Sequence, residues 1–121
     1  MTKLNEEAKK AIAEMRPAVV ATAAKSGQPD VSAKGSLRVL DDESVAFAIV
    51  ASPRTEANIR ENPVVCVLCL DAAHRHGCRI WGAAELVTSG TLFDEFKREL
   101  GARSMTVKSV VRVKVEEVEL S

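Results

Sequence analysis

Residues 49–63, IVASPRTEANIRENP, mark the change from an apolar strand to a short helix. Ser52 suits the N-cap of this helix and Pro53 its first position, and a second proline ends the segment. The first amides of a helix have no intrahelical partner and carry the positive end of its dipole. Arg54 and the Thr55 hydroxyl add a cation and a donor there. The segment predicts either a site for an anion such as phosphate, or an ordinary capped helix with a solvated arginine.

The segment VSAKGSLRVL, residues 31–40, alternates between apolar and polar residues and predicts one strand. One face would carry Val31, Ala33, Gly35, Leu37 and Val39, and the other Ser32, Lys34, Ser36 and Arg38. A neighbouring strand would place one or two of these polar residues beside the helix start, a combination that binds phosphate well. The alternative is a polar face that meets water. The small residues on either side of the lysine would admit a flat ligand, or would pack inside a narrow barrel.

The whole chain has 121 residues, of which 46% are hydrophobic and 3% aromatic, and we expect one domain over residues 1–121. Lys+Arg and Asp+Glu both number 17, which argues against a nucleic acid or a membrane held by bulk charge. No apolar run approaches the roughly 20 residues that a membrane span needs. The N-terminal segment is charged and lacks the apolar stretch of a secretory signal, so we expect a cytoplasmic protein.

The remaining pattern predicts a chain that is mainly β with small helices. Helices are expected over residues 5–15, with Asn5 as N-cap, and over 91–100, closed by Gly101 as C-cap. The apolar stripe of the first helix is Ala8, Ala11, Ile12 and Met15. Strands are expected over residues 18–24, 31–40, 45–50, 64–70, 78–88 and 106–120. In the last strand the apolar phase slips at Glu116–Glu117, which indicates a β-bulge. Six short strands with tight turns and small inward residues favour an antiparallel sheet closed into a small barrel.

The order of these elements resembles a known family. The elements follow in this order: a strand, a turn containing glycine, a strand with a cation, a VLDD turn, a strand and then SPRTEANIRENPVV. This order is similar to that of the FMN-binding split β-barrel family related to pyridoxamine 5'-phosphate oxidase. The resemblance is best over residues 19–87, and RTEANIRENPVV is its most specific part. IWGAAELV and VVRVKVEEVEL also resemble the end of the family's domain. The resemblance implies a six-stranded antiparallel split β-barrel and a homodimer with FMN at its interface.

The resemblance also implies which residues bind the cofactor. The phosphate contacts of the family fall on Arg54 and Thr55, with Ser52 nearby. The strand that edges the isoalloxazine ring falls on Ser32, Ala33, Lys34 and Gly35. Val50 and Ala51 would lie along the ring or the ribityl chain. If Lys34 reaches the N1/C2 carbonyl edge of the ring, its charge would raise the reduction potential of the flavin.

The resemblance implies an FMN-binding flavoprotein that acts as an oxidoreductase or a small electron carrier, with a small molecule or a protein as redox partner. The alternatives are a split barrel that binds a deazaflavin or a haem-type ligand, and a ligand-binding protein without turnover. Pyridoxamine 5'-phosphate oxidase itself carries a C-terminal segment with Arg and His for its substrate, and VEEVELS has neither. We therefore expect no vitamin B6 oxidase activity.

Three cysteines are present, and we expect them to be reduced thiols. Cys66 and Cys69 lie three residues apart in an apolar strand, which places them on opposite faces. Cys69, His74, His76 and Cys78 could together form a zinc site, but they do not have the spacing of a familiar zinc knuckle, so we expect no metal. The segment His74–His76 would be a solvated loop, or a rim that touches FMN across the dimer.

Trp81 faces away from the apolar side of its strand. We expect it to form a dimer contact or, alternatively, a contact with the flavin. The sequence contains no arrangement of a nucleophilic triad and no glycine-rich dinucleotide loop.

Overall fold

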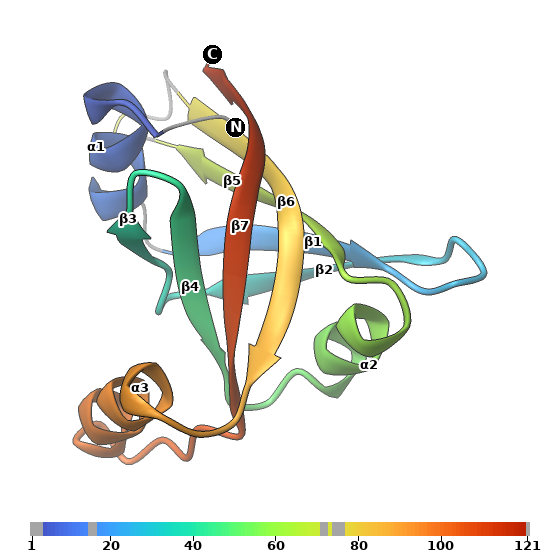
Figure 1. The fold of residues 1–121 in the computed structure, drawn as a ribbon, viewed down its shortest axis with the longest axis vertical. Helices are drawn as coiled ribbons and strands as arrows, with labels where there is room; N and C mark the ends of the chain where they lie inside the picture. The colour runs from blue at the N-terminus through green and yellow to red at the C-terminus, as the bar shows by residue number, and fades with distance from the viewer. Residues whose placement is uncertain (1–3, 15–16, 71–72, 74–76, 121) are drawn as a thin grey trace.

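The computed structural model describes residues 4–14, 17–70, 73 and 77–120, which form three helices and seven strands (Figure 1). The helices are α1 (Glu6–Glu14), α2 (Pro53–Glu61) and α3 (Thr91–Gly101). The strands are β1 (Ala18–Ala23), β2 (Pro29–Lys34), β3 (Arg38–Asp41), β4 (Ser44–Ile49), β5 (Val64–Leu70), β6 (Gly77–Val87) and β7 (Ser109–Leu120). None of the helices in these ranges is both long and apolar enough to cross a membrane.

All strands join one antiparallel sheet in the order β2-β1-β5-β6-β7-β4-β3. The two edge strands, β2 and β3, follow one another in sequence and are joined by residues 35–37. The mainly β fold with small helices and antiparallel pairing confirms the prediction. The predicted count of six strands and the closed barrel are wrong, because the sheet has seven strands and stays open between β2 and β3.

The extra strand arises because residues 31–40 do not form one strand. The chain turns at Gly35–Ser36, and the Ala48 amide of β4 donates a hydrogen bond of 2.8 Å to the Ser36 hydroxyl. This contact fixes the turn against β4 and starts β3. The predicted faces are also reversed in β2, where Val31 is 66% exposed and Lys34 only 8% exposed.

Two hydrophobic clusters hold the sheet and helices together. The larger cluster lies between α1 and the inner face of the sheet, and Ile12, Phe47 and Ile80 are fully buried in it. The smaller one packs Phe96 and Leu100 of α3 against β4 and the start of β7. Figure 1 shows α3 at the end of the sheet where β4 and β7 meet, apart from α1. α3 is thereby held beside the segment that follows β4.

Several local predictions are confirmed. The Ala8 amide donates to Asn5 Oδ1 at 2.8 Å, as expected of an N-cap. In β7, Glu117 lies opposite Trp81 and Val115 opposite Gly82, so one extra residue forms the predicted bulge. The stripe residues Ala8, Ala11 and Ile12 are buried, and Met15 lies outside the described residues.

The prediction for Gly101 is wrong by one position. Gly101 is the last residue of α3, and Ala102 is the C-cap in a right-handed helical conformation. The left-handed residue of this turn is Ser104, with φ of 63°. The chain therefore closes the helix through the turn at residues 102–104 and not through the glycine.

Candidate functional site

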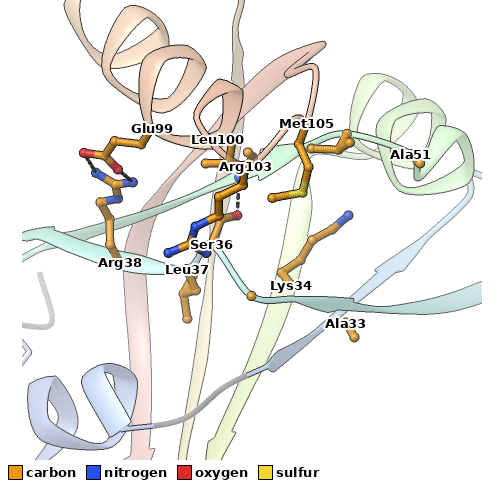
Figure 2. A pocket seen from close by; sticks show the side chains of 13 residues that line it. Ala33, Lys34, Ser36, Leu37, Arg38, Ala51, Glu99, Leu100, Arg103 and Met105 are labelled. Carbon is orange, nitrogen blue, oxygen red and sulfur yellow. Dashed lines mark hydrogen bonds and ion pairs between the residues drawn. The ribbon is translucent and has the colours of Figure 1, made fainter.

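A pocket of about 540 Å³ opens between the β2–β3 turn, the segment after β4 and the end of α3 (Figure 2). Five residues that the sequence assigned to the cofactor line it: Ala33, Lys34, Gly35, Val50 and Ala51. They come from two segments, because β2 ends and β4 runs out at the same corner of the sheet. The other predicted site residues, Ser32, Ser52, Arg54 and Thr55, do not line this pocket.

Lys34 connects the pocket with the start of α2. Its ammonium donates a hydrogen bond to the Ser52 hydroxyl. The side chain is almost entirely buried, and desolvation lowers the pKa of Lys34 below its ordinary value of 10.5. The prediction that a cation of residues 31–40 lies beside the helix start is confirmed for this residue. The ammonium therefore contacts Ser52, which was expected near the FMN phosphate.

The start of α2 keeps its donors free. Ser52 is the N-cap residue, as predicted, with Pro53 at the first helical position, but its side chain makes no cap hydrogen bond. Within the described ranges, no acceptor receives the amides of Arg54 and Thr55. These two amides and the helix dipole therefore present positive potential beside the buried lysine.

Two buried hydroxyls near this point also have no hydrogen-bond partner among the described residues. Thr55 is 1% exposed, and its Oγ1 is unpaired. The Ser32 Oγ of β2 is likewise buried and unpaired. Leaving a buried hydroxyl without a partner costs about 1–3 kcal/mol. Such groups are expected where a ligand supplies the missing partner.

Arg54 is exposed and makes no ion pair within the part of the chain that the structure describes. The neighbouring arginine of the same helix, Arg60, instead lies 3.9 Å from Glu56. Arg54 therefore remains available to an anion at the helix start.

Two other members of the predicted polar face have structural partners. Ser36 accepts the Ala48 amide, as described above, and Arg38 forms a two-pronged ion pair with Glu99 of α3. The Arg38 guanidinium also lies 3.9 Å from the centre of the Phe96 ring. The hydrogen bond from Arg38 and its charge lower the pKa of Glu99, to which the charges of Arg98 and Arg103 also contribute. The prediction that Ser32, Lys34, Ser36 and Arg38 form one face is wrong, because the chain turns between the second and the third.

The sequence missed the wall of the pocket that α3 and the following turn provide. Glu99, Leu100, Arg103 and Met105 line this side. Figure 2 shows Arg103 reaching from the turn towards the β2–β3 corner, with Met105 opposite Lys34. Arg38 and Glu99 are 61 residues apart in sequence, so no local pattern brings them together.

Two of the three cysteines are core thiols. Cys69 and Cys78 lie directly opposite each other on β5 and β6 and are fully buried, while Cys66 is half-buried on the other face. Burial raises the pKa of Cys69 to about 12 and that of Cys78 to about 11. Among the described residues no three metal-binding side chains gather around one point. His74 and His76 lie outside these residues.

Trp81 is half-buried on the outer face of the sheet. The pairing of the strands places four residues in one row across the sheet: Trp81 of β6, Cys66 of β5, Ala21 of β1 and Val31 of β2. This row is apolar across four neighbouring strands. The outer face of β2, β1, β5 and β6 therefore differs from the charged surface expected of a fully solvated sheet.

Comparison with known proteins identifies the family. The profile described as pyridoxamine 5'-phosphate oxidase matches residues 4–121. The chain belongs to the pyridoxamine 5'-phosphate oxidase family. The resemblance seen in the sequence to its FMN-binding split β-barrel members is thereby confirmed. No curated protein matches the chain.

Solved structures of other proteins share the fold over nearly the whole chain. HupZ of Group A Streptococcus is 29% identical, with a TM-score of 0.86 over 94% of this chain and 90% of HupZ. An FMN-binding protein from Syntrophomonas wolfei is 16% identical, with a TM-score of 0.82 over 94% of this chain and 84% of that one. HutZ, a haem storage protein from Vibrio cholerae, is 20% identical, with a TM-score of 0.71 over 100% of this chain and 94% of HutZ. At such identities the last two show the fold alone.

Proposed function

We propose that the protein is an FMN-binding flavoprotein that acts as an oxidoreductase or a small electron carrier. The observation that carries the proposal is the contact between the buried Lys34 ammonium and Ser52, at a helix start that also holds the unpaired Thr55 hydroxyl. Burying this cation is costly, because the charge of Asp30 stabilises it only in part and no ion pair with an acid is formed among the described residues. A phosphate dianion at this point would compensate that charge and supply the missing acceptor.

The phosphate end of the proposed site uses the start of α2. The amides of Arg54 and Thr55 would donate to the phosphate oxygens, together with the Thr55 hydroxyl. The Arg54 side chain has its charge free for the same anion. Lys34 would add a second charge from the side of β2. Arg54 and Thr55 are the phosphate contacts that the resemblance implies, whereas the resemblance placed Lys34 at the edge of the ring.

The ring side of the proposed site is the pocket. Its volume of about 540 Å³ lies in the range of small-molecule sites. Ala33, Gly35 and Ala51 have small side chains, so a flat ring can approach the backbone on this side. When bound, FMN supplies electron or hydride transfer. The chain's own residues bind the phosphate, orient the ring and exclude water from one of its faces.

We also propose a homodimer with FMN at its interface. The apolar row from Val31 to Trp81 continues in Val64, which is 53% exposed, and such a patch is typical of a surface that another chain covers. The patch reaches Ala33, which lines the pocket. A second copy on this face would therefore border the flavin.

The dimer is tested by molar mass in solution. Wild type should have about twice the mass of the 13.0 kDa chain. Trp81→Glu should give monomers, because a carboxylate cannot be buried unpaired in an apolar interface. Lys97→Glu, on the exposed side of α3, is the control that stays dimeric. A wild-type monomer at micromolar concentration would overturn this part of the proposal.

A haem-type ligand is the second candidate. HutZ shares the fold, and Met105 offers a thioether to the pocket, a group that binds haem iron in some proteins. A deazaflavin is a third ligand that the same phosphate contacts would accept. These ligands differ in absorbance, so one set of titrations separates them.

The experiment is titration of the purified chain with FMN, a deazaflavin and haem, with absorbance and flavin fluorescence as readouts. We expect a yellow protein that releases FMN on denaturation. Arg54→Ala should weaken FMN binding about tenfold or more, since it removes a charge-assisted hydrogen bond, and should leave the melting temperature unchanged. Arg60→Ala, at the other end of the helix, is the matched control with unchanged affinity.

Two results would count against FMN. One is a colourless protein that cannot be reconstituted with FMN. The other is an Arg54→Ala variant that loses stability and FMN affinity together, which would make the arginine structural. Preferential binding of haem, unaffected by Arg54→Ala, would favour the second candidate.

A further inference from the structure

We propose that Arg103 binds the anionic group of a second small ligand, the redox substrate, in the same pocket. The inference rests on the proposed function, because it takes the start of α2 as the FMN phosphate site. It assigns a substrate class, a small organic molecule with a carboxylate or phosphate group.

The charges of the pocket do not balance. Three cations, Lys34, Arg38 and Arg103, and one acid, Glu99, line it. Arg38 and Glu99 neutralise each other as an ion pair. Lys34 faces the start of α2, where the FMN phosphate would compensate its charge. Arg103 is left with its charge in the pocket.

Arg103 has no ion pair or side-chain hydrogen bond among the residues that the structure describes. Its guanidinium reaches from the turn after α3 towards the β2–β3 corner (Figure 2). The charge of Arg103 acts on Glu99 of the same pocket wall, but no acceptor among the described residues is in hydrogen-bond contact with its five donors. Such an arginine suits a planar oxyanion. Because it reaches the pocket from α3, it lies apart from the start of α2.

The turn that carries Arg103 is fixed by the backbone. The amides of Arg103 and Met105 both donate to the Leu100 carbonyl, at 2.9 and 3.0 Å. Between them, Ser104 has φ of 63°, an uncommon conformation for a residue other than glycine. A left-handed residue is common where a helix ends, and here it fixes the course of the turn. The turn places the side chains of residues 103 and 105 on the pocket together.

The two side chains offer complementary chemistry. Met105 lies opposite Lys34 and supplies an apolar, adaptable surface. Leu100 continues this surface on the same wall. A ligand with an apolar body and one oxyanion would place its body along these residues and its anion at Arg103. Neutral or cationic molecules of the same size would be disfavoured.

The test is calorimetric titration of the full chain with two probes, inorganic phosphate and malonate. It is run with FMN at saturation and again without FMN. The variants are Arg103→Gln and, as a matched control on the exposed face of α3, Arg98→Gln. Arg103→Gln should weaken binding of at least one probe about tenfold or more with FMN present. Arg98→Gln should leave it unchanged, and both variants should keep the FMN affinity of wild type.

Each result decides the inference. If Arg103→Gln weakens the binding of malonate alone, the substrate is a carboxylate. If it weakens the binding of phosphate alone, the substrate is a phosphate ester. If it weakens both, the site binds oxyanions in general. Equal probe affinity in all three proteins, or no binding of either probe to wild type, would overturn it. A loss of FMN affinity in Arg103→Gln as large as the loss of probe affinity would also overturn it, because Arg103 would then hold the cofactor. If the chain binds no FMN, the proposed function fails, and the titrations without FMN decide the role of Arg103.

Discussion

The Lys34 ammonium donates a hydrogen bond to the Ser52 hydroxyl and so joins the end of β2 to the start of α2. The contact takes the N-cap hydroxyl away from its usual role, since Ser52 makes no cap hydrogen bond to the helix. The chain therefore keeps a buried cation and two free helix amides at one point. In the absence of an anion, the buried cation lowers the stability of the fold.

The first prediction follows from the cost of burying Lys34. Lys34→Met should stabilise the protein without FMN by about 1 kcal/mol, because it removes a desolvated charge and frees Ser52 to cap α2. The same variant should weaken FMN binding about tenfold or more. Thermal unfolding with and without FMN measures both effects. Lys97→Met, at an exposed position, is the control that changes neither.

The stability difference between Lys34→Met and wild type should also depend on pH. Because burial lowers the pKa of Lys34 from 10.5, the unfolded chain binds more protons between the two pKa values. The penalty from this residue is complete below the folded pKa and disappears as the pH rises to 10.5. The stability gain of Lys34→Met over wild type should therefore shrink as the pH rises through this window. A gain that is constant with pH would contradict a desolvation origin.

The second prediction concerns the unpaired hydroxyl of Thr55. Thr55→Val keeps the shape of the side chain and removes the buried polar atom, so the protein without ligand should keep or gain stability, by up to about 1 kcal/mol. FMN affinity should fall about fivefold or more.

The matched control for Thr55 is Thr22, a buried threonine whose hydroxyl accepts a hydrogen bond of 3.0 Å from Asn58 Nδ2. Thr22→Val should cost about 1–3 kcal/mol, because the buried amide loses its partner, and should leave FMN affinity unchanged. Denaturant unfolding and flavin fluorescence measure the two quantities. If Thr55→Val destabilises the chain as much as Thr22→Val, the Thr55 hydroxyl is structural.

The third prediction tests the bulge between β6 and β7. A Cβ at Gly82 would lie 2.2 Å from the Lys114 carbonyl oxygen and 2.7 Å from Val113 Cγ1. Gly82→Ala should therefore destabilise the protein by about 3 kcal/mol or prevent folding. Gly101→Ala is the control, since nothing lies within 4 Å of the added Cβ and the residue is helical. It should stabilise α3 by up to about 1 kcal/mol. Equal melting temperatures of the two variants would disprove the close approach.

The sequence predicted those features that depend on local pattern. The cap at Asn5, the limits of α2 and the extra residue in β7 follow from residues within a few positions of one another. These are short-range rules of helix ends and strand alternation. The expectation that one or two polar residues of 31–40 lie beside the start of α2 holds for Lys34, although the predicted face was wrong.

The sequence did not predict the break within residues 31–40. The alternation of apolar and polar residues there is compatible with one long strand and equally with two short ones. The turn exists because Ser36 accepts an amide from β4, a contact that appears only in the folded sheet. The reversed face of β2 has the same origin, since Lys34 is turned inwards by its contact with Ser52. The pocket wall with Arg103 depends on where α3 packs, which Phe96 determines through the smaller cluster.

The fourth prediction concerns the reactivity of the cysteines. Thiolates react and thiols do not, and burial raises the pKa of Cys69 to about 12 and that of Cys78 to about 11. Cys66 is half-buried on the outer face, and desolvation raises its pKa too. At pH 8, iodoacetamide should therefore modify Cys66 slowly and the other two only when the chain opens. Peptide mass spectrometry with and without urea measures the three rates.

The same labelling bears on the proposed dimer. Cys66 lies opposite Trp81 in the apolar row, so a second copy on this face would shield it. Its labelling should be faster in the monomeric Trp81→Glu variant than in wild type, while Cys69 and Cys78 stay slow in both. Equal rates for Cys66 would place the dimer contact elsewhere. Labelling of Cys69 or Cys78 in the native protein as fast as that of Cys66 would contradict their burial between β5 and β6.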